Sequence, residues 1–121
     1  MENARSLNLR LGHKLVSIQL EDSAAARDLR ALLPLTLVFN DLLGREKFAH
    51  LPEALSSEDA RITRYGRGDI VFWPPGPDIS IYYGPNDRFI SAGVFRLGRV
   101  VSGLDDLARV GPLHALIEAT D

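Results

Sequence analysis

Short segments with strand-like alternation, and only one stretch with helical periodicity, most constrain what this chain can fold into. Apolar and polar residues alternate from Leu7 to Leu11, and the same two-residue period returns from Val16 to Leu20. Gly12-His13 between them suits a two-residue type II′ turn, because glycine accepts the positive φ of its first position. The N-terminal segment is therefore expected to form a β-hairpin.

One helix is predicted after this hairpin. Asp22 or Ser23 can accept a hydrogen bond from an otherwise unbonded backbone N–H, and residues 24–33 are nearly all good helix formers. Their three leucines share one face, which we expect to lie on the sheet. Pro34 ends the helix because it disfavours the α conformation of the residue before it.

Further strands are expected along the rest of the chain, since β-branched and aromatic residues recur between turn-forming ones. They are Leu35–Phe39, a short strand near Lys47–Phe48, Asp69–Trp73, Ile79–Tyr83, Val94–Val101 and Leu113–Ala119. The predicted fold is mainly β, a barrel rather than a doubly wound sheet, with one principal α-helix.

The connections are expected to contain little regular structure. Asn40, Asp41 and Gly44 have turn chemistry, and Leu51–Arg64 is predicted to be a loop with a helical turn at Pro52–Leu55. A second short helix is expected at Gly103–Arg109.

Length and charge limit the functional classes. The 121 residues suit a single domain spanning 1–121. The net charge of −2 makes nucleic acid an unexpected partner. Cysteine is absent, which excludes disulfides and thiolate metal sites. No apolar run is long enough to cross a membrane and residues 1–10 contain no apolar leader, so a cytoplasmic location is expected.

Two segments are similar to cyclophilins in sequence. Residues 12–32 resemble the cyclophilin hairpin strand, acidic turn and first helix, and residues 94–105 resemble the pattern V-F-G-K-V-x-x-G-x-D with one residue inserted. Between them, residues 68–72 and 80–83 stand where cyclophilins have a G-x-hydrophobic strand and the S-Q-F-F-I strand. The chain resembles the small, uncharacterised cyclophilin-like proteins of bacteria and archaea, which implies a barrel of about eight strands.

The resemblance is weaker at the positions of the cyclophilin active site. Prolyl isomerisation in that family depends on an arginine in a segment F-x-R-V-I-P, and the counterpart here is Phe48-Ala49-His50-Leu51-Pro52. His50 thus stands at the place of the arginine and lacks its five-donor guanidinium. Ile81 occupies a position where cyclophilins have glutamine. No catalytic residue can be assigned, and standard cyclophilin catalysis is not expected.

Several residues are candidates for a groove beside the barrel. His50 is either an ordinary surface histidine or part of a cleft. Arg61, Arg64 and Arg67 are either solvated or replace the missing arginine. Aromatic residues provide rigid apolar area at binding sites but more often pack in cores. The aromatic candidates for the groove are Phe48, Trp73, Tyr82 and Tyr83.

The tyrosine pair poses a question of orientation. Strand alternation puts Tyr82 and Tyr83 on opposite faces, so only one can point into the barrel, and the sequence leaves open which. The three histidines lack the spacing of metal ligands, so neither a metal nor a cofactor is expected.

The leading functional hypothesis is a domain that binds a peptide segment or small molecule in this groove. The first alternative is a peptidyl-prolyl cis-trans isomerase that uses Arg61, Arg64 or Arg67. The second is an accessory subunit of an amide-hydrolysing complex, because cyclophilin-like domains also occur in such enzymes. The oligomeric state is left open.

Overall fold

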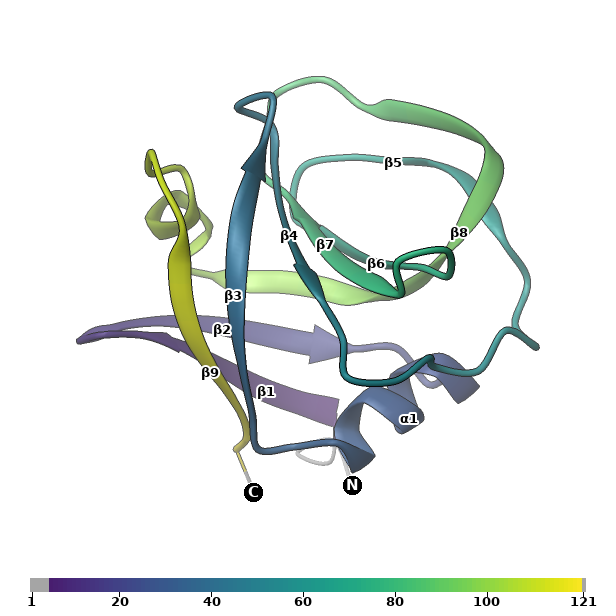
Figure 1. Cartoon of the computed structure of the whole chain (residues 1–121), viewed down its shortest axis with the longest axis horizontal. Coiled ribbons are helices and arrows are strands. Elements are labelled where there is room, and N and C mark those ends of the chain that lie inside the picture. The colour runs from purple at the N-terminus through teal and green to yellow at the C-terminus, as the bar shows by residue number, and fades with distance from the viewer. Residues whose placement is uncertain (1–4, 121) are drawn as a thin grey trace.

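The structure, a computed structural model, describes residues 5–120 (Figure 1). Its strands are joined by short turns except at three longer connections, residues 21–34, 51–61 and 103–112. The elements in chain order are β1 (Ser6–Leu11), β2 (Lys14–Leu20), α1 (Ala24–Ala31), β3 (Leu35–Leu42), β4 (Glu46–His50), β5 (Ile62–Tyr65), β6 (Asp69–Trp73), β7 (Asp78–Tyr82), β8 (Arg88–Ser102), the 3-10 helix η2 (Leu104–Leu107) and β9 (Leu113–Ala119).

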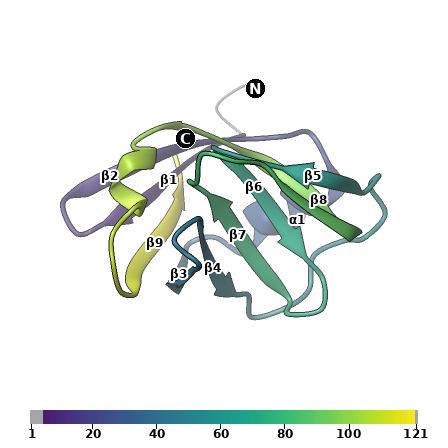
Figure 2. The ribbon, with the colours of Figure 1, turned by 90° about the horizontal axis from the view of Figure 1, so that it is seen from above.

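Eight strands form a closed antiparallel barrel. They follow the order β2-β1-β9-β3-β4-β7-β6-β8, and β8 pairs back with β2 to close the ring. β5 is a ninth strand that pairs only with the first part of β8. Figure 2 shows the β1–β2 hairpin and β9 toward one side of the molecule and β5 toward the other. The expected mainly β fold of about eight barrel strands is confirmed.

Alternation along the strands builds the core. Leu7, Leu9 and Leu11 of β1 are buried, as are Ile18 and Val16, which pair with Leu7 and Leu9 in β2. The helix α1 packs on this core through Ala25, Ala26 and Leu29. Its capping follows the prediction, because the Ser23 hydroxyl accepts a hydrogen bond from the Ala26 N–H at 3.2 Å.

Two predicted connections differ from the structure. Leu51–Arg64 is a loop only as far as residue 61 and has no helical turn at Pro52–Leu55, whereas Ile62 to Arg64 belong to β5. This strand is too short to show a recognisable two-residue period, and its pairing with β8 determines its conformation. Asn40 and Asp41 lie within β3, and the turn is formed by Leu43 and Gly44 at φ 56° and 66°.

The positions of Tyr82 and Tyr83 also differ from the expectation that one of the two rings points into the barrel core. Tyr82 is buried, but it lies in a second apolar cluster outside the barrel. Tyr83 is half-buried and follows the last residue of β7. The two rings do lie on opposite faces of the sheet. Tyr82 is nevertheless buried, because other residues cover the face that points away from the barrel interior.

A buried lysine ties the C-terminal segment to the barrel. The Lys47 ammonium is fully buried and donates to the carbonyl oxygens of Arg109 and Gly111, at 2.5 and 3.2 Å. Its charge is balanced by Asp41, whose carboxylate lies 3.3 Å away and also accepts a hydrogen bond from the Tyr83 hydroxyl. Burial alone would raise the pKa of Asp41, but hydrogen bonds from Tyr83, Gly44 and Lys47, together with the lysine charge, lower it below 3.8.

Tyr83 should make stability fall at alkaline pH. Burial and the neighbouring Asp41 raise the pKa of Tyr83 from 10.0 to about 12. The folded state therefore holds this proton more tightly, so the stabilisation is present below pH 10 and is lost as the pH rises toward 12. We expect Tyr83→Phe to flatten the wild-type loss of unfolding free energy between these pH values, measured by urea denaturation from pH 8 to 12. Identical pH profiles for the two proteins would contradict this.

No helix within residues 5–120 has the length and apolar character required to cross a bilayer.

Candidate functional site

Strands β4 and β7 have two differently used faces. Their register pairs Glu46 with Tyr82 and Phe48 with Ser80. Because side chains alternate, these four residues share the outer face, whereas the intervening side chains face the barrel interior. The outer face of an antiparallel sheet usually meets solvent, but here other strands cover it.

The cover consists of β5 and the first part of β8, which arch beside β6 and β7 (Figure 1). It is joined to the sheet by a second apolar cluster of Tyr65, Val71, Tyr82 and Val94, in which the Tyr65 and Tyr82 rings meet edge to face at 5.6 Å. β8 passes from cover to barrel near Gly93, whose φ of 81° glycine adopts without steric cost.

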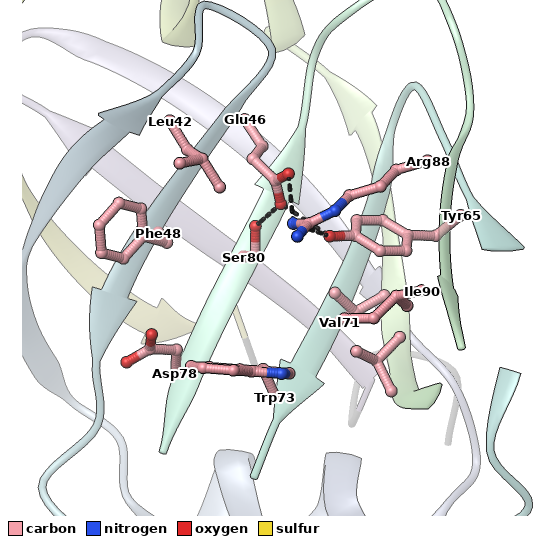
Figure 3. A pocket seen from close by; sticks show the side chains of 11 residues that line it. Leu42, Glu46, Phe48, Tyr65, Val71, Trp73, Asp78, Ser80, Arg88 and Ile90 are labelled. Atoms are coloured by element: carbon pink, nitrogen blue, oxygen red, sulfur yellow. Dashed lines mark hydrogen bonds and ion pairs between the residues drawn. The ribbon is translucent and has the colours of Figure 1, made fainter. Parts of the chain in front are cut away.

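A cavity of about 240 Å³ lies between the cover and the outer face of the sheet (Figure 3). Apolar side chains make up most of its wall, and four polar or charged side chains reach it. The lining residues are Leu42, Glu46, Phe48, Tyr65, Val71, Trp73, Asp78, Ser80, Arg88, Ile90 and Val94.

One end of this pocket contains a charged network centred on Glu46. The side chain is 1% exposed, and its Oε1 accepts hydrogen bonds from the Tyr65 hydroxyl at 2.8 Å and the Ser80 hydroxyl at 2.5 Å. Oε2 accepts a hydrogen bond from Arg88 Nη1 at 2.9 Å, and Arg45 Nε lies 3.4 Å from the same oxygen. A buried carboxylate is stable only when paired in this way.

The network fixes Tyr65 as a donor and Arg88 as a cation. Burial and the charge of Glu46 raise the pKa of Tyr65 well above its ordinary value, so its hydroxyl stays protonated. That hydroxyl also accepts a hydrogen bond from Arg88 Nη1 at 3.0 Å. Within residues 5–120, Arg88 forms hydrogen bonds only through Nη1, so its Nε and Nη2 donors are available to a ligand.

The opposite end of the pocket contains Asp78 and Trp73 (Figure 3). The Asp78 side chain is 10% exposed, and its Oδ1 lies 2.5 Å from Nδ1 of His50. His50 itself is 75% exposed and stands outside the pocket wall. Trp73 keeps 37% of its surface exposed, which places it at the rim.

The structure brings together some of the residues proposed from the sequence. Phe48 and Trp73 line the pocket, His50 contacts its Asp78, and Tyr82 packs beneath it against Tyr65. Tyr83 lies apart from it, with its hydroxyl on Asp41.

The three candidate arginines do not line this pocket. Arg61 lies over the Phe95 ring at 4.6 Å and Arg64 over the Phe89 ring at 5.6 Å. Arg67 donates to the Tyr83 carbonyl oxygen at 2.5 Å and to Asp105 at 3.1 Å. Each guanidinium therefore already has a partner elsewhere.

Sequence reasoning missed Glu46, Tyr65, Ser80 and Arg88. Tyr65 and Arg88 are paired opposite each other across β5 and β8, in a part of the sheet the sequence did not predict. Ser80 looked like an ordinary polar position within a strand. The one available signal was Glu46 beside Lys47 in a short strand, since alternation places neighbouring side chains on opposite faces and one of the two charges then faces the core.

The polar groups of the pocket lie at its two ends. Within the described part of the chain, no three His, Asp or Glu side chains are grouped as metal ligands. The site offers an apolar cavity, a fixed cation with unused donors at one end and a carboxylate at the other.

A closed antiparallel barrel with one helix packed on it and a short 3-10 helix is the fold of a small cyclophilin-like domain. The model of the Cyclophilin-like family matches residues 9–120, so the chain belongs to this family. The solution structure of a hypothetical protein from Archaeoglobus fulgidus is similar, with a TM-score of 0.77 and 18% sequence identity. The similarity covers 96% of this chain and 95% of the archaeal one. No curated protein matches the sequence.

Proposed function

We propose that this domain binds a small molecule or a peptide segment by enclosing an apolar group in the pocket beneath β5 and β8. The observation that carries the proposal is the combination of a 240 Å³ apolar cavity with Arg88, a cation held in place but not saturated. Binding sites of this kind are mostly apolar and contain a few fixed polar groups that orient the ligand.

The network around Glu46 supports a role beyond stability. Glu46 balances the charge of Arg88, and Tyr65 holds the same Nη1 from the other side. A guanidinium restrained in this way loses little further freedom when it meets a ligand, so less of the binding energy is spent on ordering it.

Fluorescence of Trp73 provides the test, because it is the only tryptophan in the sequence and lies at the rim of the pocket. Titration with neutral aromatic fragments and N-acetylated dipeptide amides should give saturable changes for at least one of these classes. Ile90→Phe should abolish them by filling the pocket. The matched control Val38→Phe, at an exposed position of β3, should not. Failure of every compound to bind would contradict the proposal.

Prolyl isomerisation is a second candidate function, and Arg88 is the observation that favours it. An arginine beside an apolar pocket can donate to a prolyl amide while the pocket holds the ring, and none of Arg61, Arg64 and Arg67 is in this position. A protease-coupled assay with a proline tetrapeptide should then show acceleration that is lost in Arg88→Lys and kept in Arg64→Lys. If the wild-type protein did not accelerate isomerisation, the isomerase function would be rejected and only the binding function would remain.

A further inference from the structure

We propose that the ligand of this pocket is a carboxylic acid with a small apolar body, and that Arg88 binds its carboxylate. The inference rests on the proposed function and names the class of ligand. It depends on three features: the unused side of the Arg88 guanidinium, the balance of charge around Glu46, and the position of Asp78.

The bonding of Arg88 leaves a carboxylate-binding edge unused. Nη1 is the atom bonded to both Glu46 and Tyr65. In a guanidinium, the Nε–H and one Nη2–H point in the same direction and form a fork that matches the two oxygens of a carboxylate. The partners of Nη1 within the described residues therefore leave that fork available. Arg88 lines the pocket, and its side chain is 28% exposed.

The charges at this end of the pocket favour an anion. Glu46 is the one carboxylate in the network, and two guanidinium groups approach its Oε2: Arg88 at 2.9 Å and Arg45 at 3.4 Å. Among the described residues no second carboxylate forms an ion pair with either guanidinium, so the cluster of Glu46, Arg88 and Arg45 has a net positive charge, although Arg45 lies outside the pocket wall. The surrounding apolar wall strengthens the attraction between this charge and a bound carboxylate, because it excludes water from the contact.

Asp78 sets the orientation of the ligand. It lies across the pocket from Arg88, beside Trp73 (Figure 3). A carboxylate at that end would meet a like charge that is only 10% exposed, so the ligand should place its apolar body there and its acid group at Arg88.

The size of the cavity limits the apolar body. A cavity of about 150 Å³ holds benzene, so 240 Å³ accommodates one ring or a branched aliphatic chain together with a carboxylate. Both a free acid and the C-terminal residue of a peptide have this chemistry. Phenylacetate represents the first source, and a tetrapeptide ending in phenylalanine with a free C-terminus represents the second.

The decisive experiment compares each acid with its own amide on the wild-type protein, by Trp73 fluorescence and by NMR titration. Phenylacetate should bind at least about tenfold more tightly than phenylacetamide, since the fork gives two charge-assisted hydrogen bonds to the acid. The same comparison with the tetrapeptide and its C-terminal amide identifies the source: preference only for free phenylacetate indicates a small-molecule ligand, and preference in both pairs indicates that C-termini are accepted.

Three variants test which residue causes the preference for the acid over the amide. Arg88→Lys keeps the charge but removes the fork, so the preference for the acid should fall several-fold. Asp78→Asn removes a like charge, so the acid should bind as tightly as before or more tightly. Arg10→Gln, in an exposed ion pair on β1, should leave both affinities unchanged.

The outcomes separate this inference from the proposed function. Equal affinities for acid and amide would overturn the carboxylate assignment while leaving pocket binding intact. No binding of any acid or amide would overturn both. If the preference for the acid over the amide were unchanged in Arg88→Lys and lost in Asp78→Asn, the ligand carboxylate would lie at the Asp78 end of the pocket, and the inference would be wrong.

Discussion

Replacing Glu46 with alanine is expected to lower the free energy of unfolding by about 3 kcal/mol, the low end of the range for removing one partner of a buried ion pair. The carboxylate is 1% exposed and accepts hydrogen bonds from three side chains. Its loss leaves the Tyr65 and Ser80 hydroxyls without their acceptor and Arg88 without its counter-charge. The loss should be moderated because the Arg88 side chain remains 28% exposed and can turn toward water. Urea denaturation at pH 7 measures the effect.

Two further variants test this explanation. Glu46→Gln keeps one acceptor oxygen and should cost less than Glu46→Ala, whereas Glu118→Ala removes an exposed partner of Arg10 and should cost less than about 1 kcal/mol. Adding Arg88→Met to Glu46→Ala should recover part of the lost stability, since one of the two guanidinium groups left without the carboxylate is then removed. If Glu46→Ala were as mild as Glu118→Ala, the network would not be a structural requirement of the pocket.

Lys47→Met should cost about 2–3 kcal/mol, and the effect should be concentrated at one end of the barrel. The ammonium is fully buried and bonds two backbone carbonyl oxygens of the segment that leads into β9. Methionine fills similar space but donates to neither, so the segment from Arg109 to Gly111 loses its attachment and Asp41 loses its counter-charge. Denaturation gives the total cost, and amide hydrogen exchange should show faster exchange at residues 109–113 than elsewhere.

The control for Lys47→Met is Lys14→Met at the exposed end of the β1–β2 hairpin, which should change stability by no more than about 0.5 kcal/mol. Uniformly faster exchange over the whole barrel would mean that Lys47 stabilises the fold without holding this segment in particular.

Much of the barrel could be predicted from local patterns. The two-residue period from Leu7 to Leu20, broken only by Gly12-His13, corresponds to β1 and β2, and Ser23 with the following alanines corresponds to α1. These elements follow their local preferences because packing agrees with them. β5 could not be found this way, because four residues provide too little pattern and their conformation depends on pairing with β8.

The site was less predictable because its chemistry comes from distant parts of the chain. Glu46 meets Tyr65 across 19 positions, Ser80 across 34 and Arg88 across 42. Phe48 is a groove candidate because it stands in the segment that resembles F-x-R-V-I-P, and Trp73 because it is aromatic and lies beside a proline-rich turn. Arg88 follows a turn and precedes the predicted strand Val94–Val101, so nothing in its local sequence marks it as part of a pocket.

The two buried charges at the start of β4 also affect how the barrel can assemble. Glu46 faces the pocket and its neighbour Lys47 faces the barrel interior, each with partners of opposite character. If β4 paired with its neighbours one residue out of register, every side chain of β4 would change faces. Glu46 would then point into the barrel interior and Lys47 toward the pocket. A misaligned barrel would thus bury two uncompensated ions, so this dipeptide makes the misfolded alternative far less stable than the native alignment.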